Sequence, residues 1–159
     1  MGIRNAMAHI VTGVAALTPG SDAGEGYYCD ADAAGNVTPL ERVAGRQSRQ
    51  FDIQNSADTG PQDDGESGLT QRRFSIQLDL RMSYPIGGDE ALVRRMALED
   101  MGIVGRALAS ISIGAAATTA GILSVMPVST STLTQLSNDE GREVAWMWFV
   151  TFTLIYREV

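Results

Sequence analysis

The stretch Arg73–Tyr84, RFSIQLDLRMSY, alternates apolar and polar side chains without interruption. Because successive side chains of a β-strand point to opposite faces, this pattern predicts one strand with an apolar face and a polar face. At about 3.3 Å per residue such a strand spans roughly 40 Å, which is long for a globular domain. We expect its apolar face to contact the core, and its polar face to contact water or a hydrated interface.

The C-terminal segment REVAWMWFVTFTLIYREV (142–159) contains both tryptophans and predicts another strand. Its first face consists of Trp146, Trp148, Val150, Phe152, Leu154 and Tyr156. Its second face, which is also largely apolar, consists of Ala145, Met147, Phe149, Thr151, Thr153 and Ile155. A strand with two apolar faces is expected to lie within a sheet, with its second face covered either by loops of the same chain or by a neighbouring subunit.

Two segments have the periodicity of helices. The segment 1–17 repeats apolar residues at steps of three and four and is ended by Pro19, which favours an amphipathic helix over a secretory signal. A second helix is expected to begin after Asp89, a favourable N-cap, and to end near Gly114. Its charged residues, including Asp100, are expected mainly outside its apolar face.

The other segments give weaker signals. Short strands are predicted around Tyr27 and within 48–55, and an edge strand within 122–136, where Pro127 would interrupt the ladder of a central strand. The acidic segment 56–68 predicts a hairpin loop, and AAATTAG (115–121) predicts a linker.

Together these elements predict a single α+β domain over residues 1–159, in the order helix, strand, strand, helix, strand, strand (αββαββ). The helices should pack on one face of a mainly antiparallel sheet. Long acidic loops are expected at about 19–48 and 55–69.

The composition offers few groups for catalysis. Cys29 is the only cysteine and His9 the only histidine, which excludes an internal disulfide and a multi-cysteine metal site and favours a reducing compartment. The paired carboxylates are adjacent in sequence, and nothing indicates the shifted pKa that a catalytic pair needs. The segments 30–36 and 58–67 partly match a calcium loop; the first lacks its third oxygen ligand and its final Glu, and ordinary acidic loops are preferred. We therefore expect no enzyme activity, no catalytic residue, no cofactor and no bound metal.

The net charge of −7 is concentrated in one part of the chain. Ten acidic residues and three arginines lie between Gly20 and Thr70, whereas the rest of the chain has nine of each. The chain has no basic stripe that could bind phosphates, so direct recognition of nucleic acid is not expected. No apolar run approaches the roughly 18–20 residues of a membrane helix.

The order helix, hairpin with a long loop, helix, hairpin, in a chain of this length, resembles the tail terminator proteins of long-tailed bacteriophages. The resemblance is carried by RRFSIQLDLRMSYPIGG (72–88), by the helix DEALVRRMALEDMGIVGRAL (89–108) that follows it, and by the C-terminal segment 142–159. It covers most of the chain and is a resemblance of pattern.

The resemblance implies a homo-oligomeric ring, commonly a hexamer, that is part of the virion tail or neck and is assembled in the host cytoplasm. Such a ring sits on the last ring of tail tube protein, stops its polymerisation and presents a surface to the head-completion or stopper protein. DNA would pass through the lumen without sequence-specific binding, and no membrane is involved. Acidic loops suit this role, because like charge discourages DNA from adhering.

Seven residues are candidates for subunit or partner contacts: Tyr27, Tyr28, Arg73, Arg81, Met147, Phe149 and Ile155. Aromatic and Met side chains are enriched at interfaces, and arginine is a bidentate donor suited to subunit contacts. Other functions stay open within the same class, namely another neck or tail-completion protein or a tail tube subunit. From a different class, a small α+β ligand-binding module or an enzyme stays open as well.

Overall fold

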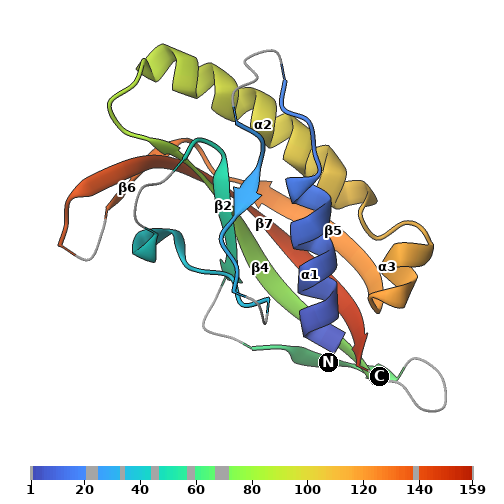
Figure 1. The fold of residues 1–159 in the computed structure, drawn as a ribbon. Helices are drawn as coiled ribbons and strands as arrows, with labels where there is room; N and C mark the ends of the chain where they lie inside the picture. The colour runs from blue at the N-terminus through green and yellow to red at the C-terminus, as the bar shows by residue number, and fades with distance from the viewer. Residues whose placement is uncertain are drawn as a thin grey trace.

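The computed structural model of the chain describes residues 2–20, 25–32, 35–43, 47–56, 60–66, 72–137 and 140–158 (Figure 1). Its helices are α1 (Gly2–Ala15), the short 3-10 helix η1 (Leu40–Arg42), α2 (Glu90–Ser110) and α3 (Ala115–Thr119). Its strands are β1 (Tyr28–Cys29), β2 (Gln50–Asn55), β3 (Gln62–Glu66), β4 (Arg72–Pro85), β5 (Ile122–Thr130), β6 (Thr134–Ser137) and β7 (Glu143–Glu158).

The centre of the sheet is the antiparallel pair β4–β7, which stays in register from Arg72 opposite Glu158 to Pro85 opposite Ala145. The strand order is β1-β2-β4-β7-β5, with β3 pairing with β4 and β6 pairing with β7. Each central strand therefore carries two shorter strands along its outer edge, and β1 runs parallel to β2. The predicted α+β class is confirmed, and the C-terminal strand lies inside the sheet as its two apolar faces require.

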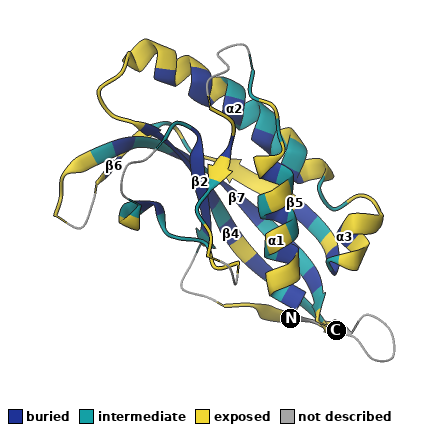
Figure 2. Cartoon of the chain, viewed as in Figure 1, coloured by how far each residue is buried: buried dark blue, intermediate teal, exposed yellow. Residues whose placement is uncertain are grey.

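The helices cover one face of the sheet, where α1 and α2 pack on β7 and where α2 and α3 pack on β5. This face buries the apolar side chains of β4 and β7, including Met82, Trp148 and Phe152, which are fully buried (Figure 2). Helix α1 contributes Ala6 and Ile10 from its buried stripe. The main core is therefore a layer of helices on the apolar face that alternation predicted.

The second helix begins as predicted and ends earlier than predicted. The carboxylate of Asp89 accepts a hydrogen bond of 2.9 Å from the main-chain N–H of Ala91 and so caps α2. After Ser110 the chain turns, and Gly114, at φ 106, precedes the short helix α3 where a linker was predicted. That prediction is wrong because the segment is rich in alanine, the strongest helix former, and lies between two glycine turns.

Two further predictions of strands need correction. The acidic segment expected to be a hairpin loop contains strand β3, paired with the first residues of β4 and interrupted by a bulge between Asp63 and Glu66. The long strand β4 supplies main-chain partners there, and pairing along it overrides the low strand propensity of Asp and Gly. The single edge strand predicted within 122–136 is two strands, β5 and β6, both paired with β7. Residues 21–24, 33–34, 44–46, 57–59 and 67–71 of the predicted acidic loops lie outside the described residues.

Candidate assembly surfaces

The sheet face opposite the helices combines the polar face of β4 with the second face of β7. Across the β4–β7 pair, Ser83 lies opposite Met147, Arg81 opposite Phe149, and Ser75 opposite Ile155. Along the length of this face, the second face of β7 is covered either by loops of the same chain or, as the alternative, by a neighbouring subunit.

Near Met147 the second face is covered by the chain itself. Leu40 of η1 is fully buried and packs with Leu136 and Ala145, with Met147 partly buried against them. The main-chain N–H of Leu40 donates a hydrogen bond of 2.9 Å to the carboxylate of Asp52. These residues form a second, smaller core on the side of the sheet opposite α1, α2 and α3.

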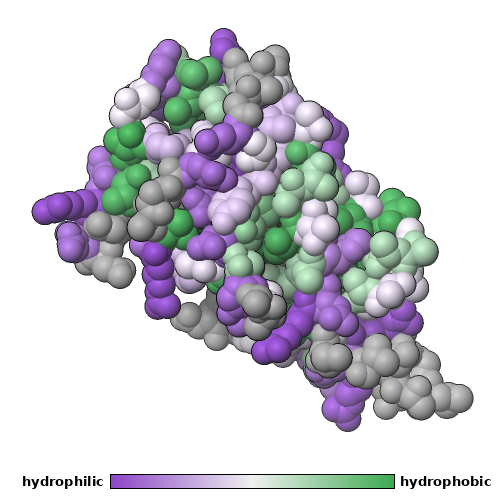
Figure 3. All heavy atoms as spheres, in the orientation of Figure 1, coloured by the Kyte–Doolittle hydropathy of each residue, from purple (hydrophilic) through white to green (hydrophobic). Residues whose placement is uncertain are grey.

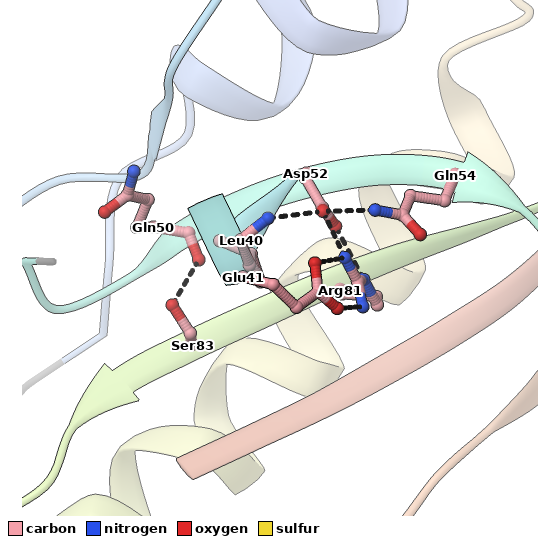
Figure 4. A network of polar contacts seen from close by, with 7 residues as sticks. All are labelled: Leu40, Glu41, Gln50, Asp52, Gln54, Arg81 and Ser83. Carbon is pink, nitrogen blue, oxygen red and sulfur yellow. Dashed lines mark hydrogen bonds and ion pairs between the residues drawn. The ribbon is translucent and has the colours of Figure 1, made fainter. Parts of the chain in front are cut away.

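A polar network fixes η1 to the sheet, and Arg81 is its centre (Figure 4). The Arg81 guanidinium donates to Asp52 Oδ1 at 2.9 Å from Nε and to Glu41 Oε2 at 2.9 Å from Nη2. Burial alone would lower the pKa of Arg81, but the hydrogen bonds that it donates to Asp52 and Glu41, and the charges of these carboxylates, raise the pKa overall, so the side chain stays charged. Arg81 was predicted as a subunit contact; its side chain is only 13% exposed and ties the chain to itself instead.

Farther along β7 the cover is partial, since Thr151 is buried and donates a hydrogen bond of 2.6 Å to Asp79, whereas its neighbours on this face are half-buried. The half-buried residues Phe149, Thr153 and Ile155 of β7, together with Met126 of β5, form a surface that we call the open face. Met126 lies opposite Thr153 and is 48% exposed. Arg73, another predicted contact, is half-buried on the same side of the sheet, opposite Arg157. Here the structure leaves room for the second alternative, cover by a neighbouring subunit.

The edge strand β5 adds apolar surface beside the open face. This surface was not predicted from the sequence. Leu123 and Val128 are 37% and 58% exposed, and the strand has register shifts next to both of them. Bulges and Pro127 protect this edge from pairing with another strand, because they interrupt the row of free main-chain groups. Contacts here would use side chains.

The adjacent tyrosines at the start of the sheet have different environments. Tyr27 is buried, and its hydroxyl donates a hydrogen bond of 2.7 Å to the carboxylate of Asp100 in α2. Tyr28, in edge strand β1, is 45% exposed. Tyr27 was predicted as a contact and is instead a core residue. Tyr28 remains a candidate contact.

Asp100 is the centre of a buried polar network beneath α2. Besides Tyr27 it accepts hydrogen bonds from Arg49 Nε at 3.0 and 3.1 Å and from the hydroxyl of Tyr84 at 2.7 Å. Burial, with the hydrogen bond and charge of Asp100, raises the pKa of Tyr27 and of Tyr84, so both keep the protons they donate. Arg49 has a left-handed φ of 59°, a conformation that costs free energy and that this network holds in place. Asp100 was expected mainly outside the apolar face of its helix and is fully buried.

A shallow apolar groove lies where α2 passes the connection between β5 and β6. This α2 groove has a volume of about 300 Å³ and is lined by Arg94, Ala97, Leu98, Met101, Ser131, Thr132 and Leu133. Leu98 is 70% exposed, and Figure 3 shows hydrophobic residues at the surface over the first half of α2. The Arg94 guanidinium lies 5.7 Å from the centre of the Trp146 ring and pairs with Glu90 at 2.7 Å.

Within the described parts of the chain, no three His, Cys, Asp or Glu side chains are grouped so that they could hold a metal ion. Asp32, in the segment that partly matches a calcium loop, accepts hydrogen bonds of 2.9 Å from the main-chain and side-chain nitrogens of Asn36. Across the same described residues, none of the helices has the length and hydropathy needed to span a membrane.

The chain matches no known family model, and no curated protein matches it. The function of the chain is therefore inferred from the chemistry of its surfaces and from the pattern of its fold.

Proposed function

We propose that this chain is a structural subunit of the head–tail junction of a long-tailed bacteriophage, a tail terminator that closes into a ring on the end of the tail tube. The proposal is supported by the order of helices and paired strands, which resembles that family. It is carried by one observation: a single subunit presents two unlike apolar surfaces. The open face lies on the side of the sheet without helices, and the α2 groove lies beside a helix.

Unlike surfaces are what a ring requires. When different patches of identical subunits meet, the contact is repeated from copy to copy, and the chain of subunits closes if the rotation fits. A symmetric dimer would instead use the same patch twice. A hexamer is the expected ring, after the resemblance.

Capping would work by shape. One side of the ring fits the last ring of tube protein, and the other side cannot add further tube protein, so growth stops. The second side is then available to the head-completion or stopper protein. The net charge of −7 suits a lumen through which DNA slides without adhering.

The decisive experiment combines electron microscopy of the purified protein with a tube-growth assay. We expect closed rings, and we expect a small amount of protein to stop the growth of tubes from purified tail tube protein. A protein that stays monomeric at high concentration would overturn the proposal. Extension into long tubes by the chain alone would identify it as a tube subunit, the nearest alternative.

A further inference from the structure

We infer that neighbouring subunits are joined by Tyr28 of one copy inserted into the α2 groove of the next copy. This inference rests on the proposed ring for the repetition of the contact. It names the residues on each side and makes the partner a second copy of this chain. The groove is then occupied by Tyr28, and the open face is left for a separate contact within the assembly.

The two halves of this contact are separate in one subunit. Tyr28 belongs to β1, the first strand in the order β1-β2-β4-β7-β5, whereas the groove is lined by α2 and by the connection that follows β5, the last strand in that order. The preceding residue Tyr27 contacts α2 at Asp100, but Tyr28 is not among the residues that line the groove of its own copy. A head-to-tail arrangement of copies brings the first edge of one sheet to the last edge of the next.

The apolar parts of the two surfaces match. Tyr28 is an aromatic side chain that is 45% exposed, and the groove presents Ala97, Leu98 and Met101 of α2 together with the half-buried Leu133. Insertion can remove only the exposed 45% of Tyr28 from water, while the hydroxyl stays at the rim, and tyrosine is enriched among residues that dominate binding. The groove volume of about 300 Å³ is of the size that accepts one such ring.

The charges around the two surfaces are opposite in sign. Exposed Glu25 and half-buried Asp30 lie on either side of Tyr28 in sequence, whereas Arg94 lines the groove. Arg94 pairs with the exposed Glu90 in its own helix and lies over the Trp146 ring, and an exposed ion pair of that kind holds an arginine weakly. Charge complementarity of this sort fixes which patches meet.

Other exposed apolar residues lack this match. Ile113, in the turn between α2 and α3, is 77% exposed and is the most exposed of the large apolar side chains described. Its sequence neighbours from Ile111 to Thr119 carry no charge. Ile113 is exposed, lies outside the groove and has no charged residue such as Arg94 beside it in sequence, so it provides the control position for the groove side of the contact.

The direct test is cross-linking between two variants that each carry one cysteine. In a Cys29→Ser parent, cysteines are placed beside the contact, so that Tyr28 and Leu98 stay in place. Gly26→Cys and Thr132→Cys are made at exposed positions in separate chains with tags of different mass, mixed, and treated with a short bis-maleimide. We expect a cross-linked pair that contains both tags. Replacing the Thr132→Cys chain with an Ile113→Cys chain should reduce the yield at least tenfold, and equal yields would overturn the inference.

A second test measures assembly by analytical ultracentrifugation. Tyr28→Ala and Leu98→Asp should each weaken association roughly tenfold or more, and the double variant should be little weaker than either, because the two residues form one contact. Arg94→Glu should also weaken association, and mixing it with Glu25→Arg chains should restore part of the loss. Both Tyr28 and Leu98 are exposed, so the circular dichroism of these variants should match that of the parent.

The outcomes separate the two proposals. Rings that persist in Leu98→Asp with unchanged affinity would overturn the Tyr28 contact and leave the ring itself intact. A parent protein that never associates would overturn the ring, and with it the contact proposed here.

Discussion

Trp148 Nε1 donates a hydrogen bond of 2.9 Å to the hydroxyl oxygen of Tyr84, although the residue directly opposite Tyr84 in the sheet is Trp146. The bond is therefore diagonal across the β4–β7 pair. The Tyr84 hydroxyl in turn donates to Asp100 of α2, so one chain of hydrogen bonds joins both central strands to the helix above them. Such a satisfied network in the core specifies how the helix sits on the sheet.

Removing the charge at the centre of this network should destabilise the protein strongly. Asp100→Asn leaves the buried guanidinium of Arg49 without its carboxylate, and breaking a buried pair in this way costs about 3–5 kcal/mol. Urea unfolding followed by circular dichroism measures the loss. Asp63→Asn, at an exposed pair with Arg72, is the control and should change the free energy of unfolding by less than about 1 kcal/mol.

Alkaline pH should unfold the protein through the same tyrosines. The raised pKa of Tyr27 and Tyr84 means that the unfolded chain, with an ordinary value of 10.0, loses these protons before the folded chain does. Their contribution to stability is thus full below pH 10 and falls as the pH rises above it. Phenolate absorbance of these two residues should appear together with the loss of circular dichroism. Ionisation of both in a still-folded protein would contradict the burial described here.

The small core under η1 should be separable from the main core. Leu40→Ala removes its central side chain and should cost about 2 kcal/mol locally, the lower end for a buried leucine. Hydrogen exchange should then speed up in β6 and in the first residues of β7, which this core holds, and stay slow in α2. Equal acceleration in all elements would show that the chain has one cooperative core.

The two faces of β7 should respond differently to a buried charge. Phe149→Asp, on the open face, should abolish assembly while the free energy of unfolding falls by only about 1 kcal/mol. Trp148→Asp, in the fully buried aromatic core, should unfold the protein, because an unpaired charge there costs more than about 4 kcal/mol. Sedimentation and thermal unfolding of both variants give the answer. If both merely unfold, the open face is ordinary core.

The native thiol should react slowly. Burial, and then the nearby carboxylates of Asp52 and Asp30, raise the pKa of Cys29 to about 12, so little of the nucleophilic thiolate is present at mildly alkaline pH. Alkylation by iodoacetamide should be much faster in urea than in the folded protein. Similar rates would mean that the start of the sheet opens readily.

The sequence predicted the elements that have strong periodicity. The alternation of Arg73–Tyr84 and the two apolar faces of the last strand identified the two long strands, and Asp89 marked the start of α2. The pairing of these two strands with each other was not predicted, because the sequence placed them in separate hairpins. Strand β3 was missed because its pairing comes from the length of β4 and not from its own acidic residues. Helix α3 was missed because glycines on either side of a short alanine-rich segment resemble a loop.

The network around Asp100 depends on contacts between distant residues, which a single sequence does not reveal. Asp100 stands four residues from both Met96 and Val104, which are buried, so its helical spacing is that of the core stripe, although its charge led to the prediction that it lies outside the apolar face. Its partner Arg49 lies 51 residues away, and no local pattern joins the two. In the same way, the contact of Arg81 with Glu41 depends on where a long loop crosses the sheet.

All 14 residues of β4 are matched one to one with residues of β7, in opposite directions. A load that pulled these two strands past one another would have to strain many main-chain hydrogen bonds at the same time, since those bonds run perpendicular to the strands. The pair β5–β7, with its two register shifts, would yield to the same load sooner. The centre of the subunit is thereby its mechanically strongest part, and under tension the edges should separate first.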